Sequence, residues 1–548
     1  MSAARPVRIA NCAGWLWDRF SGLRDALAGP VDVVTGDYLA EPTLRQLALE
    51  RAKDPSLGYA QSFLAQFTDA VGLLAQRGAR LVVDAGGLNP AGLADEVRRV
   101  IAEAGLDLVV AHVEGDDLSA RLDSLGALEH LDTGVPLADS GLEPTTANAY
   151  LGGWGIAAAL ADGADVVLCP RVTDASLTVG AAAWWHRWGT EDWTALAGAV
   201  AAAHVIECGP QATGGNFSGF TAVPRVDDLG YPIAEIAADG TAVITKHEVA
   251  GGTVTTDTVT AQLLYEVDGP RYLTPDVTAR LDTVTLSRDA PDRVRITGTR
   301  GEAPPDTVKV GAIVPAGWHN EMTFVLTGLD VEAKAEHALA ALWAGVPGGR
   351  DAFDRVETRL LRADVPDPRR MTDAVSLLTV AVAGNRDACA RLSRAAVETA
   401  LSGYPGFFAT TPPGPGSAAS VFWPILLPAA DLPQLVGLAD RTWTVPPPTA
   451  AAPSERGLPA PSSSEQRVRS DRTVRAPLGR LVGARSGDKG GNATLGLWAR
   501  DDAAYAWLSS WWDDEHVARL GRGHQAGRQI HRVAEVITAG GDHRTEAQ

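Results

Sequence analysis

Short runs of valine, leucine and isoleucine alternate with longer helix-like stretches through the first 225 residues of the chain. Continuous apolar runs of this kind are typical of parallel strands that helices cover on both faces. The pattern predicts strands at 7–11, 31–36, 80–87, 107–115 and 164–170. It predicts helices near 18–28, 43–53, 59–77, 90–104 and 147–161. Residues 1–225 are therefore expected to form a doubly wound, mostly parallel α/β lobe.

From about residue 230 the pattern changes to one that favours antiparallel strands. Asp239-Gly240 lies between two β-rich segments, which is a hairpin signal. Further strand-like runs lie at 281–288, 292–299, 307–315 and 321–328. A mixed block follows, with helices near 331–344 and 386–402 and strands at 376–384 and 419–427. Residues 226–445 are expected to form a mixed α+β lobe that completes the main domain.

Residues 446–472 are rich in proline, alanine and serine, a composition typical of a semi-extended linker. Residues 473–548 are predicted to form a small separate α+β unit. Its segment "ARSGDKGGNATLGLWAR" (484–500) reads as strand, glycine loop and strand. The loop is either a tight hairpin turn or an anion-binding turn that uses Lys489. One strand-like run, 532–538, follows, which indicates a truncated unit.

Charge and cysteine content narrow the class of protein. The net charge of −19 argues against a nucleic-acid partner, because phosphate binding needs a basic face. No apolar run is long enough to span a membrane, and the N-terminus lacks the apolar core of a secretory signal. The four cysteines have neither metal-ligand spacing nor the density of a disulfide scaffold. We therefore expect a soluble protein of the reducing cytoplasm.

Polar residues follow each of the five predicted parallel strands. Ligands bind such sheets outside the carboxyl ends of the strands. The residues at these ends are Asn11, Asp37, Asp84 with Gly86, Gly87 and Asn89, then Glu114 and Asp116, and finally Arg171. One polar loop tip is ordinary, but five in succession favour a binding site.

Familiar cofactor signatures are missing from the sequence. "DAGGLNPAG" (84–92) lacks the glycine spacing of dinucleotide folds, and "SGDKGGN" (486–492) lacks that of a P-loop. No histidine pair has metal-ligand spacing, and Ser176 does not lie in a nucleophile elbow. We therefore expect neither a cofactor nor a metal.

Metal-free acid–base chemistry remains, and the segment "HVIECGPQATGGNFSGF" (204–220) offers its parts. Glu207 or His204 can serve as base or acid, and the backbone N–H groups of Gly209, Gly214 and Gly215 as donors to an oxyanion. Cys208 is a weaker candidate, as a nucleophile. The alternative is a glycine-rich crossover in which Cys208 is a small buried hydrophobe.

Several long segments resemble one protein family. They include "TGDYLAE" (35–41), "DAGGLNPAGLA" (84–94), "TANAYLGGWGIAAAL" (146–160), "GADVVLCPRVTDASLTVG" (163–180), "HVIECGPQATGGNF" (204–217) and "TAQLLYEVDGPRYLTPDV" (260–277). Over residues 8–445 the chain resembles the acyclic terpene utilisation A family of bacteria, which is related to proteins that degrade citronellol and geraniol. The 484–500 segment resembles the small ferredoxin-like domain that often follows the main domain in this family.

The resemblance implies breakdown of branched acyl-CoA intermediates, by a lyase or hydratase of a 3-hydroxy-3-methylglutaryl-CoA-like thioester. We therefore predict a cofactor-independent lyase or hydro-lyase acting on a branched or carboxylated acyl thioester. One carboxylate from Asp37, Glu114 or Asp116 would share the chemistry with Glu207 or His204. The family's glycine- and serine-rich loop is replaced here by "NCAGWLW" (11–17), so another substrate is plausible. The alternatives are a biosynthetic tailoring enzyme acting on another carboxylated substrate and a non-catalytic ligand-binding or scaffold protein.

Substrate contacts are expected from both regions. Arg19, Arg171 and Lys489 are candidates for an anion site, and the remaining candidates are Asn11, Asp84, Gly86, Gly87, Asn89, Asn148, Asp174, Gln211, Thr213, Gly214, Gly215 and Asn216. We expect residues 204–220 to face the strand ends that carry Asp37, Asp84 and Glu114. A homo-oligomer is expected from the fifteen tryptophans and from the prevalence of symmetric assemblies.

Overall fold

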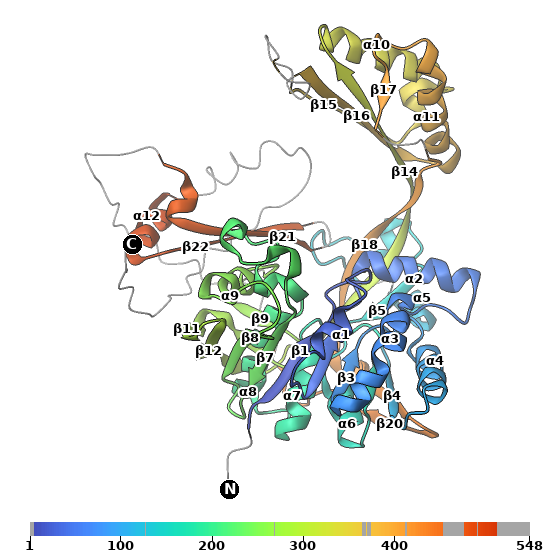
Figure 1. Cartoon of the computed structure of the whole chain (residues 1–548). Helices are drawn as coiled ribbons and strands as arrows, with labels where there is room; N and C mark the ends of the chain where they lie inside the picture. The colour runs from blue at the N-terminus through green and yellow to red at the C-terminus, as the bar shows by residue number, and fades with distance from the viewer. Residues whose placement is uncertain are drawn as a thin grey trace. The chain divides into compact units, whose positions relative to one another are not determined.

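The computed structural model describes residues 5–125, 128–267, 269–363, 369, 374–410, 414–452, 476–489 and 492–511. The chain divides into two compact units (Figure 1). Unit 1 comprises residues 1–136, 146–312 and 424–548, and unit 2 comprises residues 137–145 and 313–423. The expected lobes, 1–225 and 226–445, differ from this division because strands well beyond residue 225 extend the sheet of unit 1.

Unit 1 is built on an eleven-stranded sheet. Five adjacent strands are parallel, in the order β1 (Val7–Asn11), β2 (Val33–Gly36), β3 (Arg80–Val83), β6 (Val166–Leu168) and β4 (Val110–Glu114). Antiparallel strands continue beyond β1 as β7 (Pro232–Ile236), β8 (Ala242–Lys246), β12 (Arg293–Thr297) and β11 (Thr285–Ala290), and beyond β4 as β19 (Gln434–Leu438) and β20 (Arg441–Val445). The predicted parallel core and the Asp239-Gly240 hairpin are both confirmed.

Helices cover both faces of the parallel strands. On one face lie α1 (Gly22–Ala26), α3 (Gln61–Arg77) and α4 (Pro90–Glu103), and on the other lie α6 (Trp154–Ala161), α7 (Ser176–His186) and α8 (Trp193–Ile206). Successive side chains along a strand point to opposite faces of the sheet, so each strand contributes residues to the core on both faces. Leu81 and Val83 of β3, for example, belong to the core cluster of the first face, whereas Val82 between them does not. The α/β fold class is confirmed.

Several local predictions require correction. The helix expected at 147–161 begins only at Trp154, and Thr146–Ala149 forms a strand, β5, that pairs with β14. Gly152 and Gly153, which are poor helix formers, separate the two elements. The two strands expected at 307–315 and 321–328 are a single strand, β14 (Thr307–Thr327). Its carboxyl half stays paired with β16 without a break from Trp318 to Thr327.

Three further parts complete unit 1. Helix α2 (Glu41–Lys53) follows β2, and α9 (Thr256–Leu263) precedes a small antiparallel sheet of β9 (Arg271–Leu273), β10 (Thr278–Arg280) and β13 (Arg300–Glu302). The predicted strand, glycine loop and strand form the hairpin β21 (Val482–Lys489) and β22 (Asn492–Ala499), followed by α12 (Asp502–Trp511). Most of the expected linker and the strand expected at 532–538 lie outside the described residues.

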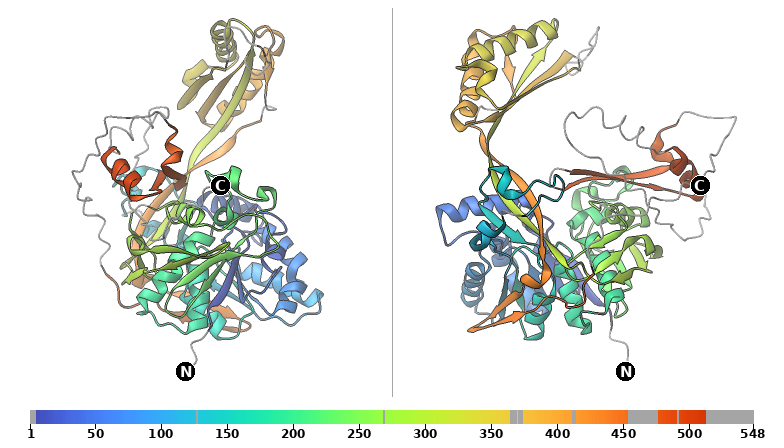
Figure 2. Two further views of the ribbon diagram at one scale, coloured as in Figure 1. Left: turned by 60° about the vertical axis from the view of Figure 1, so that its left-hand side comes forward. Right: turned by 180° about the vertical axis from the view of Figure 1, so that it is seen from behind.

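Unit 2 has its own sheet and core. Its antiparallel strands are β15 (Arg355–Leu361), β16 (Val375–Gly384), the carboxyl half of β14, and β17 (Phe408–Ala409), with helices α10 (Val331–Ala344) and α11 (Arg386–Glu398). Phe324, Leu342 and Leu392 are fully buried in the core cluster that these elements share. The chain leaves unit 1 along β14 and returns along its partner β18 (Ser417–Pro428) (Figure 2). Among the described helices, none is both long and apolar enough to cross a membrane.

Candidate functional site

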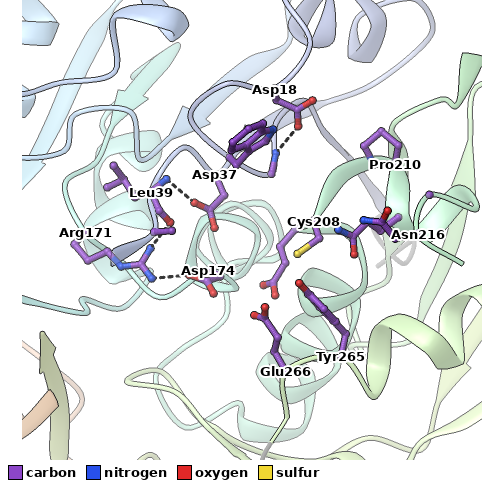
Figure 3. A pocket seen from close by; sticks show the side chains of 16 residues that line it. Asp18, Asp37, Leu39, Arg171, Asp174, Cys208, Pro210, Asn216, Tyr265 and Glu266 are labelled. Atoms are coloured by element: carbon purple, nitrogen blue, oxygen red, sulfur yellow. Dashed lines mark hydrogen bonds and ion pairs between the residues drawn. The ribbon is translucent and has the colours of Figure 1, made fainter. Parts of the chain in front are cut away.

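A cavity of about 500 Å³ lies in unit 1 at the carboxyl ends of β2 and β6. Its wall is formed by Gly14, Trp15, Asp18, Asp37, Leu39, Ala40, Arg171, Asp174, Glu207, Cys208, Pro210, Gln211, Gly215, Asn216, Tyr265 and Glu266. Five of these side chains are carboxylates and one is a guanidinium. Figure 3 shows Asp37, Arg171 and Asp174 on one side of the cavity, facing Cys208, Tyr265 and Glu266. Two groups of ionisable residues therefore meet across a single space.

Asp37 follows β2 directly and belongs to a pair of buried carboxyl groups. Its Oδ1 accepts a hydrogen bond from the backbone N–H of Leu39 at 2.9 Å. Burial, followed by repulsion from Asp174, raises the pKa of Asp37 to about 6. Beneath it, Asp84 is 1% exposed, and burial together with the charge of Asp37 raises the pKa of Asp84 well above its ordinary value. Asp84 therefore carries the proton of the pair, and Asp37 ionises near neutral pH.

Arg171 supplies the positive charge of this group and is almost wholly buried. Its Nη1 donates to the carbonyl oxygen of Leu39 and its Nη2 to Oδ1 of Asp174, both at 3.0 Å. The guanidinium also lies 4.3 Å from the ring centroid of Tyr150. Arginine stays protonated in proteins, and the surrounding carboxylates raise its pKa further. A fixed cation is thereby held beside Asp37.

Two predicted residues brace the backbone behind Arg171. The carboxylate of Asp116 accepts hydrogen bonds from the Nδ2 of Asn148 at 2.8 Å and from the backbone N–H of Arg171 at 3.3 Å. Burial raises the pKa of Asp116 to about 7. Neither Asp116 nor Asn148 belongs to the cavity wall. The structure thus gives a supporting position to both Asp116, a predicted catalytic carboxylate, and Asn148, a predicted substrate contact.

Glu207 and His204 come from the end of α8. The spacing of three residues places both side chains on one face of the helix, with His204 Nδ1 3.1 Å from Glu207 Oε1. Both are buried, and the His204 ring packs on Tyr272 at a centroid distance of 5.0 Å. Asn11 holds this end of the helix, because its Nδ2 donates to the carbonyl oxygen of Glu207 at 3.1 Å. Glu207 reaches the cavity wall, whereas His204 supports it from outside the wall.

The glycine-rich turn after Cys208 is held by hydrogen bonds within its own backbone. The N–H of Gly214 donates to the carbonyl oxygen of Gln211 at 3.2 Å, and that of Gly215 to Pro210 at 2.9 Å. The N–H groups of Gly214 and Gly215 are thus paired within the turn, and their predicted role toward an oxyanion, like that of Gly209, stays a prediction. Gly214 is needed for its conformation, since its φ is +118° and a Cβ there would lie 2.7 Å from Val223 Cγ1. The cavity wall offers the guanidinium of Arg171 as a charged hydrogen-bond donor.

A second cavity, of about 320 Å³, adjoins the first and shares Asp174 and Glu266 with it. Its remaining lining is Leu131, Tyr150, Thr173, Tyr272, Leu273, Thr274, Pro275, Pro305, Thr307, Val308, Lys309 and Leu426. Apolar and aromatic side chains predominate here, in contrast to the carboxylates of the first cavity. The two cavities therefore differ in the ligand groups that suit them, polar in the first and apolar in the second.

The structure places some predicted site residues together and separates others. Eight of them share the wall of the first cavity: Asp37, Arg171, Asp174, Glu207, Cys208, Gln211, Gly215 and Asn216. Outside that wall lie Asn11, Arg19, Asp84, Gly86, Gly87, Asn89, Glu114, Asp116, Asn148, His204, Thr213 and Gly214. The side chain of Lys489 lies outside the described residues.

Local geometry explains several of these exclusions. Arg19 donates to the carbonyl oxygen of Leu229 at 2.6 Å and stacks on Tyr231. Asn89 caps helix α4, and the Thr213 hydroxyl donates to the carbonyl oxygen of Gly230 at 2.7 Å.

Backbone geometry explains why three more of the predicted residues lie outside the cavity wall. Gly86 and Gly87 form the tight turn after β3, where a Cβ on Gly86 would lie 2.5 Å from the carbonyl oxygen of Cys169. Glu114 ends β4 and pairs there with Leu435 of β19.

The sequence analysis did not identify Asp18, Leu39, Ala40, Pro210, Tyr265 and Glu266, whereas Gly14 and Trp15 belong to the segment 11–17 that it had singled out. Tyr265 and Glu266 lie just after α9, within a segment already noted for its family resemblance, which was the available signal. Asp18 accepts a hydrogen bond from the hydroxyl of Tyr231 at 2.7 Å, so its place depends on a residue far away in sequence. Within the described part of the chain, no group of three or more histidine, cysteine, aspartate or glutamate residues is arranged to hold a metal ion.

Comparison with known proteins gives one match. Searches among curated proteins and among solved structures found no significant match. The model of the family described as "Acyclic terpene utilisation family protein AtuA" matches residues 7–438, which include both cavities described above. This range covers most of the chain and agrees with the segments that carried the resemblance in the sequence. The protein therefore belongs to the acyclic terpene utilisation family AtuA.

Proposed function

We propose that the protein is a lyase or hydro-lyase that acts on a branched or carboxylated acyl thioester by acid–base chemistry. The observation that carries the proposal is the meeting of two acid–base groups in one cavity. Asp37, with a pKa of about 6, lies beside the fixed cation Arg171, and Glu207, which His204 supports from behind, enters the wall from the end of α8. A group that ionises near neutral pH, as Asp37 does, is suited to moving protons.

In this mechanism the thioester carbonyl lies near Arg171, whose charge stabilises an enolate oxygen. For elimination, Asp37 removes the proton from the carbon next to the carbonyl. Glu207 acts as the acid and gives a proton to the departing hydroxyl group, which leaves as water. For carbon–carbon cleavage, the base instead removes the proton of a 3-hydroxyl group. The bond between the hydroxyl-bearing carbon and the α-carbon breaks, and the enolate that forms takes a proton from Glu207.

The shape of the two cavities supports a substrate with a branch. The reacting end would occupy the carboxylate-rich first cavity, and an aliphatic branch would occupy the apolar second cavity. Lys309 in the second cavity offers a charge to a terminal carboxylate. The charged end of the thioester carrier would remain outside the first cavity, because five carboxylates in its wall repel anions.

A different carboxylated substrate is the second candidate, as in a biosynthetic tailoring enzyme. Trp15 favours it, because this residue belongs to the segment that departs from the family pattern and lies in the cavity wall while 53% exposed. A large side chain at this position changes which substrates fit. The third candidate, a ligand-binding or scaffold protein, would use the same cavity without turnover.

A panel of coenzyme A thioesters, followed by mass spectrometry, tests the proposal. A 3-hydroxy or α,β-unsaturated branched thioester should lose or gain water, or be cleaved, in the presence of the protein. Glu207→Gln keeps the size of the side chain and should lower the rate about 10²–10⁴-fold. A thioester that binds tightly but stays unchanged favours the scaffold reading. If no thioester binds, the acyl thioester proposal fails.

We also propose a homo-oligomer. Trp15, Trp17 and Phe20 are each more than half exposed and lie within six residues of one another, which is an unusual amount of aromatic surface for a monomer. Symmetric association would cover such a surface. Light scattering at micromolar concentration should give a multiple of 57.3 kDa. The mass of a single chain would contradict this proposal.

A further inference from the structure

The C-terminal hairpin contributes one buried side chain to the surroundings of the first cavity. Arg485, in β21, is 9% exposed although it belongs to a two-stranded hairpin outside the large sheets. Its Nη1 donates to the carbonyl oxygen of Asn216 at 3.1 Å, and its Nη2 donates to Oε1 of Gln211. Its guanidinium lies 4.1 Å from the ring centroid of Tyr265. All three partners belong to the cavity wall, whereas Arg485 itself does not.

The turn that Arg485 contacts contains two residues with a left-handed backbone conformation. Gly214 and Asn216 both have positive φ values, +118° and +53°. Among residues other than glycine, asparagine adopts this left-handed conformation readily, and a hydrogen bond to its carbonyl oxygen helps to fix it. Arg485 binds the carbonyl of this residue and a side chain five positions earlier. One guanidinium thus fixes both ends of the segment from Gln211 to Asn216.

Contacts made by other residues of the hairpin fix the position of Arg485. Trp498 of β22 forms a small apolar cluster with Ala261 and Leu264, and its Nε1 donates to Asp257 at 3.2 Å. At Gly487, two residues after Arg485, the backbone approaches so closely that a Cβ would lie 2.6 Å from the ring of Tyr265. The hairpin therefore packs along α9 and the residues that follow it.

We infer that Arg485 is a positioning residue, through which the C-terminal hairpin holds Gln211, Asn216 and Tyr265 in the wall of the cavity. Arginine suits this role better than lysine, because its planar group donates to two acceptors and stacks on a ring at the same time. The sequence had suggested Lys489 as the contribution of this hairpin. The side chain of Lys489 lies outside the described residues, so its contact with an anion stays a prediction, whereas the contacts of Arg485 bear on the shape of the site.

Alkylation of Cys208 by iodoacetamide tests the inference on the full chain without a substrate. Cys208 is a partly exposed residue of the cavity wall and directly precedes the turn, whereas Cys12, Cys169 and Cys389 are buried. In Arg485→Ala the rate at Cys208, followed by mass spectrometry of the labelled peptide, should rise about tenfold, as expected when a charge-assisted hydrogen bond no longer opposes local opening. Arg485→Lys should give a smaller rise.

Arg500→Ala is the matched control. Arg500 closely follows the same hairpin and pairs with Asp257 at 3.2 Å, but it is half exposed and does not contact the turn. In Arg500→Ala, iodoacetamide should alkylate Cys208 at the wild-type rate. A wild-type rate in Arg485→Ala, or an equal rise in Arg500→Ala, would overturn the inference. If Arg485→Ala does not fold, a wild-type rate in Arg485→Lys overturns it.

The kinetic consequence rests on the proposed function and is measured separately. On whichever thioester is turned over, Arg485→Ala should lower kcat/KM, and Arg485→Lys should restore part of it. A panel in which no thioester reacts defeats the proposed function but leaves the alkylation result standing. Unchanged alkylation with normal turnover defeats the positioning role alone.

Discussion

At the scale of single residues, the environment of Asp37 determines how the site should respond to pH. Burial and the neighbouring carboxylate raise its pKa from 3.8 to about 6, so it is ionised at pH 7 and protonated at pH 5. A base is active only when ionised. The value of kcat/KM should therefore fall as the pH decreases through about 6. The pH profile of turnover, measured with the substrate that the panel identifies, checks this expectation.

A substitution of Asp37 tests the same assignment of the base. Asp37→Asn keeps an oxygen that can accept the hydrogen bond from Leu39 but cannot take up a proton. It should lower turnover about 10²–10⁴-fold and abolish the acidic limb near pH 6. An acidic limb that persists in a partly active Asp37→Asn protein would assign that ionisation to another group, and Asp37 would no longer be the base.

A site residue could be predicted from the sequence where it follows a strand directly. Asp37 and Arg171 come immediately or shortly after β2 and β6, so the strand pattern was sufficient to place them at one edge of the sheet. Glu266 and Arg485 could not be placed in this way. Glu266 follows a helix instead of a parallel strand. Arg485 contacts Gln211, Asn216 and Tyr265, which are distant in sequence and which local pattern does not connect with it.

At the scale of elements, the turn from Gly209 to Thr213 and the two residues after it shape the cavity wall. Gly214→Ala should destabilise the protein, because the positive φ is strained for alanine and the new methyl group would lie 2.7 Å from Val223. We expect a loss of about 1–2 kcal/mol, measured by denaturant unfolding. Gly72→Ala in α3 is the control. Nothing lies within 4 Å of the added Cβ there, so stability should rise slightly. Equal effects of the two substitutions would contradict this account of the turn.

The elements themselves were predictable to different degrees. Parallel strands such as β2 and β3 were found because apolar runs between polar ends identify buried strands. Helices α7 and α8 were not predicted, although they pack behind the site. Nearly every residue of α8 is buried, so its sequence, "WTALAGAVAAAHVI", has no polar face and no helical periodicity. A helix that is apolar on all sides leaves no periodic signal in the sequence.

At the scale of the whole molecule, both cavities are lined by unit 1 alone. Replacement of residues 314–422 by a short glycine-containing linker should therefore leave unit 1 folded. Cooperative thermal unfolding and a wild-type rate of Cys208 alkylation would show this. A matched deletion of β19 and β20, residues 434–445, should instead unfold unit 1, because β19 pairs with β4. Aggregation of the first variant would show that unit 2 is required for the fold of unit 1.

The pairing of β4 with β19 also means that two neighbouring strands of the sheet are synthesised far apart in time. Glu114 and Leu435 are neighbours in the sheet, yet roughly 320 residues of chain, including the whole of unit 2, are made between them. At about 5–20 residues per second, β4 waits roughly 15–60 s on the ribosome before its partner emerges. During that interval its open edge can pair with other chains. Expression at reduced temperature or with chaperones thus bears most directly on the yield of this protein.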